Sequence, residues 1–333
     1  MKSGSMQAVV VKEGAQRGQW NELVIETVDM PVPGQGEALV QVVACSVNRA
    51  DLLQRRGLYP PPPGASHVLG LDFAGVVVEV PEGSSFKEGD RVFGITAGGG
   101  YGRYAAVPED HLIPIPEKLS FIEAAAAAEV FITAYFNLFV QAGIKAGDRL
   151  LLHGGGSGVG TSAIQLCSSI GATAIVTAGS EEKVKRALEL GAHAGINYKE
   201  VDFAARVMEI TGGEGVDIIL DWIGAPYLER HLRILKTKGR LVIIGLMGGS
   251  SGEINLVPLM TGRLKIIGSV LRSQSNEEKA GIVRGFIETV LPLLASGRVK
   301  PIIERIFPIS EVEDAHRYLQ KGEHFGKVVL TWD

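Results

Sequence analysis

A glycine-rich turn between an apolar run and a helical pattern constrains this chain more than any other feature. Residues 150–167 read LLLHGGGSGVGTSAIQLC, with a strand-like run ending at His153 and five glycines in the next seven residues. Such a turn brings backbone N–H groups and the positive end of a helix toward a phosphate, where a Cβ would block the approach. The strict G-x-G-x-x-G spacing is missing, because Ser157 occupies the second glycine position. The alternative is a turn that serves only helix–sheet packing.

The surroundings of this turn favour a dinucleotide-binding site. From residue 148 to residue 273, six short apolar runs, beginning with RLLLH and ending with LKIIGSVL, are mostly separated by helical patterns. Such alternation predicts an α/β fold with a doubly wound parallel sheet of six strands, a Rossmann fold. The glycine turn follows the first of these strands and opens a helix, as a phosphate-binding turn must. We therefore expect this region to bind a dinucleotide.

The rest of the chain reads as a second domain. Residues 6–120 contain short Val-rich runs between Gly, Pro and Asp turns, a pattern that predicts a partly open β-barrel. One helical pattern, NRADLLQRR at 48–56, precedes the stiff loop GLYPPPPG. After residue 274, two helical segments (about 276–296 and 310–322) and the strand GKVVLTW are too short for a third domain. We therefore expect a barrel domain at 6–125, completed by 275–333, and a dinucleotide-binding domain at 126–274.

Composition excludes several functional classes. The chain has 33 basic and 37 acidic residues, a net charge of −4 and no long run of Lys or Arg, which argues against nucleic-acid partners. Its apolar stretches look too short to span a bilayer, and MKSGSM lacks the apolar core of a signal peptide, so a cytoplasmic protein is expected. The two cysteines, Cys45 and Cys167, exclude a disulfide framework and any Cys-rich zinc site. We expect both to be small buried residues.

The end of the second strand in the alternating region bears on the choice of cofactor. An NAD site places an Asp or Glu there, whereas residues 176–183 read VTAGSEEK. Gly179, Ser180 and Lys183 offer a small residue, a hydroxyl and an ammonium, which suit a 2′-phosphate and favour NADPH. The two glutamates after Ser180 complicate this interpretation, since Ser180 could be a helix cap and Lys183 a solvated charge. Tyr198 could cover the adenosine phosphate or stand at its rim.

The order of motifs along the chain resembles the medium-chain dehydrogenase/reductase superfamily. GDRVFG, TAY, GGGSGVGTSAIQL, TAGSEEK, DWIG, GLMGG and GKVVL follow one another in the order of that family. Within it the chain is similar to quinone oxidoreductases, and NRADLLQRRGLYPPPPGAS and GLMGG…LRS resemble the tumour-suppressor-inducible members. The resemblance implies a GroES-like β-barrel catalytic domain, a Rossmann NADPH-binding domain and a homodimer. The sixth strand, LKIIGSVL, would be an exposed edge unless a second copy pairs with it.

The resemblance also predicts that no metal is used. Zinc dehydrogenases of this superfamily carry a Cys ligand in C-H-x-D and a His ligand in G-H-E, but Asn48 and Leu71 stand at those positions. The seven histidines show no metal-binding spacing. Without a Lewis acid, dehydrogenating an alcohol is difficult, whereas hydride transfer to a quinone or an α,β-unsaturated carbonyl needs none. We expect NADPH-dependent quinone reduction in the cleft between the domains. The alternatives are an enone or alkenal double-bond reductase, and a non-catalytic NADPH-binding protein with a structural or RNA-associated role.

The site residues that follow are those implied by the resemblance. Asn48 and Tyr59 are the catalytic candidates, because an amide and a hydroxyl could hydrogen-bond a quinone oxygen as negative charge develops. Tyr59 or solvent would supply the proton. Asn48 could instead be a helix N-cap, and Tyr59 could pack on the prolines at 60–63.

The cofactor-binding candidates come from both expected domains. Arg272 could bridge cofactor and substrate or be a solvated arginine, and Lys327 could be a cofactor-side lysine or a charge at a strand edge. The full set is Asn48, Thr133, Ser157, Gly158, Val159, Gly160, Gly179, Ser180, Lys183, Tyr198, Ile223, Gly245, Leu246, Met247, Gly248, Leu271, Arg272, Ser273 and Lys327.

Overall fold

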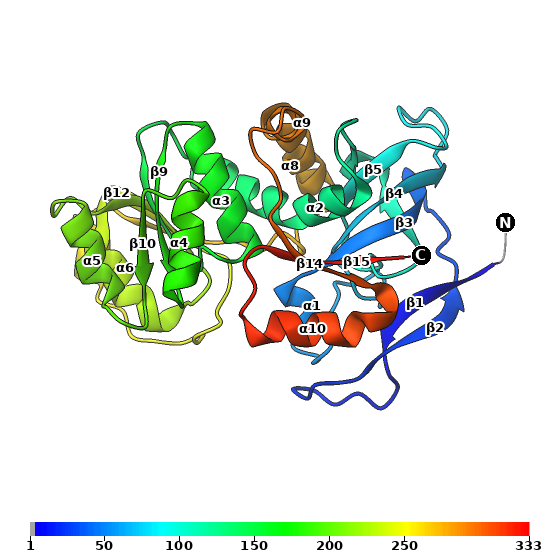
Figure 1. Ribbon diagram of the computed structural model, residues 1–333, viewed down its shortest axis with the longest axis horizontal. Helices are drawn as coiled ribbons and strands as arrows, with labels where there is room; N and C mark the ends of the chain where they lie inside the picture. Colours follow the sequence, from blue (N-terminus) through cyan, green and yellow to red (C-terminus); the bar gives the residue numbers. More distant parts are fainter. Residues whose placement is uncertain (1–3, 333) are drawn as a thin grey trace. The chain divides into compact units, whose positions relative to one another are not determined.

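The computed structural model describes residues 4–332 and separates into two compact units. One, the β-rich unit, comprises the chain up to Ile132 together with Arg272 onward, and the other, the parallel-sheet unit, is Thr133–Leu271 (Figure 1). The boundaries expected from the sequence fall inside helix α2 (Phe121–Tyr135) and just before helix α8 (Asn276–Thr289). Each unit has its own sheet, and each is described by itself.

The parallel-sheet unit has the predicted doubly wound sheet. Its strands are β8 (Arg149–Leu152), β9 (Thr173–Ala178), β10 (Ala194–Asn197), β11 (Val216–Asp221), β12 (Leu235–Ile243) and β13 (Lys265–Gly268). They lie in the order β10-β9-β8-β11-β12-β13, and every neighbouring pair is parallel. This is the Rossmann strand order, in which the direction of winding reverses between β8 and β11. The fold class predicted for this unit is confirmed.

Helices cover both faces of this sheet (Figure 1). They are α3 (Gly158–Ser169) and α4 (Glu181–Glu189) on one side, and α5 (Phe203–Ile210) and α6 (Leu228–Ile234) on the other. The central strands are buried on both faces, which is why they read as continuous apolar runs rather than alternating ones. A short helix, α7 (Leu256–Thr261), was not expected from the sequence. Helix α6 leads directly into β12, which begins at Leu235.

The β-rich unit is built around one long strand. β3 (Glu37–Val47) pairs with β4 (Asp72–Glu79), β6 (Tyr104–Pro108) and β15 (Lys327–Thr331), all antiparallel. The sheet continues through β5 (Arg91–Ile95) and β7 (Leu112–Pro114) on one side and β14 (Ile303–Pro308) on the other. β1 (Ser5–Val11) and β2 (Leu23–Asp29) form a separate antiparallel pair. The C-terminal segment therefore completes this sheet, and β14 is a strand that the sequence analysis did not foresee.

Short helices border the β-rich sheet. They are α1 (Arg49–Gln54), α8, α9 (Leu291–Ala295) and α10 (Val312–Lys321). The single helical segment expected at 276–296 is divided, since α9 begins anew with Pro292 in its first turn. A proline suits the first turn of a helix, because its missing N–H would have no intrahelical partner there. The apolar core of the unit includes Val40, Phe73 and Leu330, all fully buried.

One helical segment corrects an expectation from the sequence. α2 and the following π-helical turn, Phe136–Gln141, together make a stretch at Phe121–Gln141 that is long and apolar enough to cross a membrane by length and composition. The sequence analysis expected no stretch of that kind. However, 78% of its apolar window is buried inside the protein. Packing in the protein interior accounts for its apolar composition.

Candidate functional site

The topology of the parallel sheet gathers most of the predicted cofactor residues at one edge. The glycine turn follows β8, Gly179 and Ser180 follow β9, and Tyr198 follows β10. Ile223 follows β11, and residues 245–248 follow β12. Because the strands are parallel, their carboxyl ends meet at the same edge of the sheet, which is where doubly wound sheets bind ligands.

The glycine turn has the local geometry of a phosphate site. Ser157 is the N-cap of α3, and its hydroxyl accepts a hydrogen bond from the Gly160 N–H at 3.0 Å. The preceding amides, at Gly158 and Val159, come too early in the helix to have an intrahelical acceptor. A Cβ on Gly160 would lie 2.4 Å from the Gly154 carbonyl oxygen, so glycine is required for α3 to approach the turn. Free amides at the positive end of a helix are suited to bind a pyrophosphate.

The end of β9 combines a helix cap with a basic cluster. The Ser180 hydroxyl accepts a hydrogen bond from the Lys183 N–H at 3.3 Å. Ser180 is therefore the N-cap of α4, the alternative role that the sequence allowed. A Cβ on Gly179 would meet the Tyr198 hydroxyl at 2.9 Å and the Lys199 Cε at 3.5 Å. The phenol and the second lysine therefore lie beside Gly179. The sequence analysis missed Lys199, although its position directly after Tyr198 was a signal that could have found it.

The loops after β11 and β12 are fastened to each other. The Asp221 carboxylate accepts hydrogen bonds from the Ile223 N–H at 2.8 Å and the Gly224 N–H at 2.9 Å. The Gly248 N–H in turn donates to the Ile223 carbonyl oxygen at 2.8 Å. The two apolar side chains of the loop 245–248 are 52% and 56% exposed. The loop after β12 thus presents two exposed apolar side chains at the same edge of the sheet as the glycine turn.

The remaining candidates of this unit are less informative. Thr133 is buried in α2, and its carbonyl oxygen accepts from the Asn137 side-chain amide at 2.8 Å. Leu271, partly buried, is the last residue of the unit. Neither position contradicts a cofactor role, and both roles stay predictions.

In the β-rich unit, Asn48 belongs to a buried polar network. Its amide oxygen accepts from the Lys327 ammonium at 2.6 Å, and its amide nitrogen donates to Asp72 at 2.7 Å and more weakly to the Ser46 carbonyl. Lys327 also donates to the Val47 carbonyl oxygen at 3.1 Å. Asn48 does stand at the N-cap position of α1, but its side-chain hydrogen bonds go to this network. Both ends of the amide are occupied by protein groups.

Burial perturbs the acid of this network. Asp72 is fully buried and also accepts from the Ser46 N–H at 2.6 Å and from the Ser46 hydroxyl. Burial raises the pKa of Asp72 above its ordinary value, while Lys327 and the hydrogen bonds from Ser46 and Asn48 work in the opposite direction. The network therefore offsets part of the cost of burying the Asp72 carboxyl by surrounding it with donors.

Tyr59 belongs to a second network, centred on Arg272. It is half-buried in the loop after α1, and the Arg272 guanidinium carbon lies 5.0 Å from the centre of its ring. Burial raises the pKa of the Tyr59 phenol, whereas the Arg272 charge lowers it and Glu129 adds to the rise. Ser273, next to Arg272, is exposed. Asn48 and Tyr59 thus lie in the same unit but in different networks.

The residues at the positions of the zinc ligands do not fit a zinc ion. Leu71 is buried and offers no ligand atom. The oxygen of Asn48, the one weak ligand, already accepts from the Lys327 ammonium. A cation at this oxygen would repel a second, divalent one. A zinc ion therefore has no suitable ligands at these two positions.

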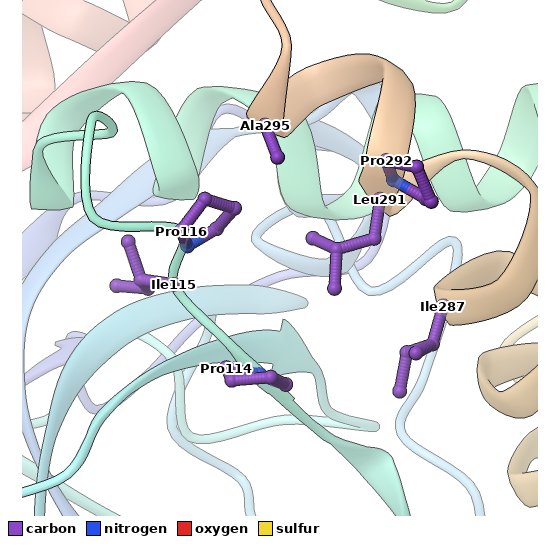
Figure 2. Close-up of a pocket in the computed structure, with 7 residues that line it drawn as sticks. All are labelled: Pro114, Ile115, Pro116, Ile287, Leu291, Pro292 and Ala295. Atoms are coloured by element: carbon purple, nitrogen blue, oxygen red, sulfur yellow. The ribbon is translucent and has the colours of Figure 1, made fainter.

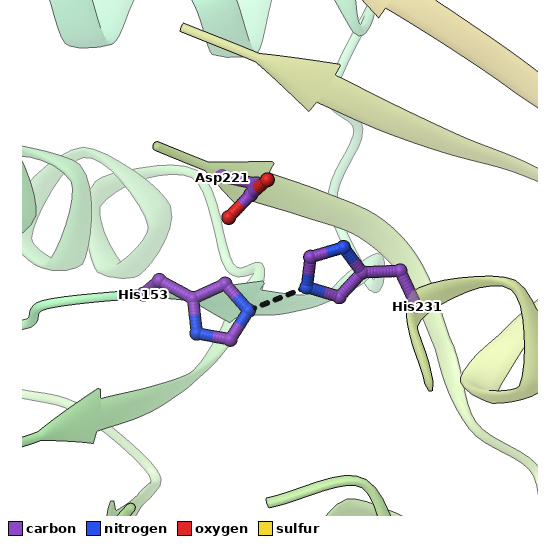
Figure 3. Close-up of side chains that lie close together, drawn as sticks. All are labelled: His153, Asp221 and His231. Atoms are coloured by element: carbon purple, nitrogen blue, oxygen red, sulfur yellow. Dashed lines mark hydrogen bonds between the residues drawn. The ribbon is translucent and has the colours of Figure 1, made fainter. Parts of the chain in front are cut away.

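One histidine cluster was not foreseen from the sequence. His153, Asp221 and His231 place their potential ligand atoms within 4.8 Å of one another, the one such group among residues 4–332 (Figure 3). However, the two Nε2 atoms of the histidines are 2.7 Å apart, a hydrogen-bond distance. Two nitrogens that share a tetrahedral zinc ion lie about 3.3 Å apart, as Zn–N bonds of about 2.0 Å require. The cluster is therefore a hydrogen-bonded histidine pair.

This pair makes the stability of the protein sensitive to acid. Burial lowers the pKa of His231 to about 3 and that of His153 well below its ordinary value, and Arg230 adds to both effects. In the unfolded chain both rings take up protons below about pH 6.5. The unfolded state therefore binds more protons, and stability is lost as the pH falls from about 6.5 toward 3.

We expect the substitution His231→Gln to reduce this acid sensitivity. A glutamine amide can still hydrogen-bond His153 and does not titrate, so one proton fewer is linked to unfolding. Between pH 6 and pH 4 the slope of the unfolding free energy should fall by up to about 1.4 kcal/mol per pH unit. Urea unfolding at a series of pH values measures it. The exposed His193→Gln is the control, and an unchanged slope in His231→Gln would contradict the assignment.

The β-rich unit also contains an apolar cavity that plays no part in the candidate site. Its volume is about 340 Å³, and Pro114, Ile115, Pro116, Ile287, Leu291, Pro292 and Ala295 line it (Figure 2). None of these side chains can donate, accept or titrate, so the cavity has no catalytic chemistry of its own.

The two cysteines, Cys45 and Cys167, are excluded as nucleophiles, because both are buried and burial raises the pKa of each thiol.

Comparisons with known proteins agree with this architecture. The alcohol dehydrogenase GroES-like domain matches residues 34–117, and the zinc-binding dehydrogenase family matches residues 158–285. Among solved structures, a quinone oxidoreductase of Pseudomonas syringae pv. Tomato DC3000 has a TM-score of 0.84 at 28% identity, covering 98% of this chain and 100% of the other. JamJ enoyl reductase has a TM-score of 0.87 at 27% identity, covering 99% and 100%.

Sequence similarity is specific enough to assign the family. The quinone oxidoreductase of Rattus norvegicus is 35% identical over 307 residues, which cover 90% of this chain and 91% of that protein. Identity at this level across nine-tenths of the chain, on the same two domains, shows that it belongs to the quinone oxidoreductases of the medium-chain dehydrogenase/reductase family.

Proposed function

We propose that this protein reduces quinones with NADPH and without a metal ion. The family uses a nicotinamide dinucleotide, and the glycine turn with free amides at the start of α3 supports its binding here. The observation that carries the choice of NADPH is the end of β9, where Lys199 lies beside Gly179, Ser180 and Lys183 begin the next helix, and residues 178–180 include no carboxylate. Such a cluster suits a 2′-phosphate.

The chain's own groups would divide the work as follows. The amides of Gly158 and Val159 hold the pyrophosphate, and the lysines after β9 and β10 neutralise the 2′-phosphate. When bound, the nicotinamide supplies the hydride. Tyr59 donates a hydrogen bond to the acceptor oxygen, which gains negative charge as the hydride arrives. This phenol or solvent then provides the proton.

Asn48 has a different role in this proposal from the one its sequence position suggested. Its amide is fully engaged by Lys327, Asp72 and the Ser46 carbonyl, so it holds the ammonium rather than the acceptor. Lys327 has three N–H donors, of which two are used by Asn48 and the Val47 carbonyl. The third can bind the cofactor or an oxygen that becomes negative. Thr133, Ile223, residues 245–248, Leu271 and Ser273 complete the proposed cofactor contacts.

The test is NADPH oxidation by purified, EDTA-treated protein with ortho-quinones, para-quinones and enones, and with NADH in parallel. Quinone turnover with NADPH and no added metal is the expected result. Faster turnover of enones would favour a double-bond reductase. The structural similarity to JamJ enoyl reductase supports this alternative. NADPH binding without turnover of any acceptor would favour a non-catalytic role.

The cytoplasmic location and the absence of membrane and nucleic-acid partners stay predictions from composition.

We also propose a homodimer formed through the edge strand β13. This strand closes one side of the parallel sheet, and Ile266 on it and Val270 after it are 37% and 46% exposed. The preceding helix α7 exposes Leu256, Val257 and Met260 by 58% to 71%. Although β13 has only four residues, its exposed apolar side chains and those of α7 favour contact with a second copy at this edge.

The dimer proposal predicts that Ile266→Lys converts the protein to a monomer. An unpaired ammonium cannot be accommodated where two copies of an apolar strand meet. Sedimentation velocity at micromolar concentration should show twice the 35.4 kDa chain mass for the wild type and the chain mass for the variant. The exposed Lys118→Met serves as the control. A wild-type monomer at these concentrations would rule the proposal out.

A further inference from the structure

Arg272 is a buried cation whose hydrogen-bond partners are all neutral. Only 7% of its surface is exposed. Its Nε and Nη2 donate to the Ala97 carbonyl oxygen at 2.8 and 2.7 Å, and Nη2 also donates to the Gln54 side-chain oxygen at 2.7 Å. Its Nη1 donates to the Tyr59 carbonyl oxygen at 3.2 Å. Four of the five guanidinium N–H groups are thus used within the β-rich unit.

These bonds fasten together three segments that no secondary structure joins. Gln54 is the last residue of α1, Tyr59 lies in the proline-rich loop that follows, and Ala97 lies in the loop after β5. Residues 55–71 contain neither helix nor strand. The tie reaches across 213 residues of sequence, from Arg272 to Tyr59. The two ends of this loop are also tied by backbone hydrogen bonds, from Gly18 to Arg56 and from Gly99 to Val68, and Arg272 supplies the tie at Tyr59 itself.

The same guanidinium also faces the Tyr59 ring. Its carbon lies 5.0 Å from the ring centre, within the range of a cation–π interaction. Burial and the Arg272 charge lower the pKa of Lys279, which is also 7% exposed, whereas the carboxylates of Asp51 and Glu129 act with the opposite sign on Arg272 and Tyr59 respectively. The Arg272 charge, which lowers the pKa of the Tyr59 phenol against the effect of burial, also favours negative charge on an oxygen that meets this phenol.

We propose that Arg272 is a positioning residue that holds the Tyr59 ring and its loop in place for the acceptor. This inference rests on the proposed function, in which Tyr59 donates to the acceptor oxygen. It differs from the role implied by the family resemblance, where Arg272 contacts the cofactor. With four N–H groups used inside the β-rich unit, one remains, too few for a bidentate grip on a phosphate.

A double-mutant cycle on Arg272→Met and Tyr59→Phe tests this role. Arg272→Met should lower kcat with a quinone about tenfold, as loss of a charge-assisted contact would, and leave the Kd for NADPH within about twofold. In the Tyr59→Phe background the same substitution should have little further effect on kcat, because Arg272 acts through the phenol. Additive effects in the cycle, or a loss of NADPH affinity with kcat unchanged, would overturn the proposal.

Two further variants keep the result interpretable. Arg272→Lys keeps the positive charge but loses the planar set of guanidinium N–H donors, so we expect its kcat to lie between those of the wild type and Arg272→Met. A kcat for Arg272→Lys as low as that of Arg272→Met would count against the role of the charge. Arg91→Met is the matched control. That arginine donates to the Leu119 carbonyl at 2.6 Å and lies 4.8 Å from the Phe121 ring centre, and its replacement should leave kcat unchanged.

Hydrogen exchange without any substrate separates this inference from the proposed function. In the free protein, Arg272→Met and Arg272→Lys should speed exchange of the loop amides at 57–59 and 64–66, on either side of the four prolines, at least about tenfold and leave β3 unchanged. If exchange does not respond, Arg272 does not position the loop and the inference fails. If exchange responds but Tyr59→Phe turns over quinones at the wild-type rate, positioning stands and the proposed role of the phenol fails.

Discussion

Replacing Ser180 by Asp is expected to lower kcat/KM with NADPH about 100-fold and to change kcat/KM with NADH less than about threefold. Aspartate caps a helix as well as serine does, so α4 should keep its hydrogen bond to the Lys183 N–H. The new carboxylate, however, would face the 2′-phosphate beside Gly179, where it replaces attraction by repulsion. Steady-state rates with both cofactors and one quinone measure the effect.

The chain offers a matched control for this substitution. The Ser120 hydroxyl accepts from the Glu123 N–H at 3.2 Å, the same capping contact as in Ser180, at the start of α2. Ser120→Asp adds the same charge away from the proposed phosphate cluster and should leave both cofactor preferences unchanged. Equal use of NADH by the wild type, or equal losses with both cofactors in Ser180→Asp, would contradict the NADPH proposal.

Lys327→Met is expected to destabilise the protein by about 3 kcal/mol at pH 8. The substitution removes the only cation bonded to Asn48 among residues 4–332 and leaves the buried Asp72 carboxyl with only the neutral donors of Ser46 and Asn48. With Lys327 gone, the pKa of Asp72 rises further above its unfolded value. The folded variant then binds more protons than the unfolded chain, so its stability falls as the pH rises. The loss should therefore be smaller at pH 5.

Guanidinium unfolding at both pH values measures this effect. In the double variant Lys327→Met/Asp72→Asn the buried charge is gone, so much of the lost stability should return and the pH dependence should disappear. The exposed Lys118→Met controls for the loss of one lysine. An equal loss of unfolding free energy in Lys327→Met at pH 5 and pH 8, with no recovery in the double variant, would contradict this prediction. It would show that the charges of Lys327 and Asp72 do not stabilise the network.

Local patterns determined the fold of the parallel-sheet unit. Alternating strands and helices, with a glycine turn after the first strand, are sufficient to predict a Rossmann sheet, because chain connectivity places all strand ends at one edge. The candidates at Gly158, Ser180 and Tyr198 follow from this rule and lie where it puts them. β14 escaped prediction because the runs around it do not alternate and its partner, β15, lies in a different segment.

The contacts of the acceptor-side residues were decided only by tertiary structure. The sequence marked Asn48, Tyr59, Arg272 and Lys327 as candidates, but not their partners. Asn48 meets Lys327 across 279 residues, and Tyr59 meets Arg272 across 213. The pairing of His153 with His231 arises in the same way, across 78 residues. Hydrogen bonds between distant segments have no sequence period, because their geometry exists only once the sheets have formed. The sequence by itself therefore determined the fold class and the edge of the parallel sheet at which the cofactor candidates lie. Only the folded structure decided which groups bond to Asn48 and Tyr59.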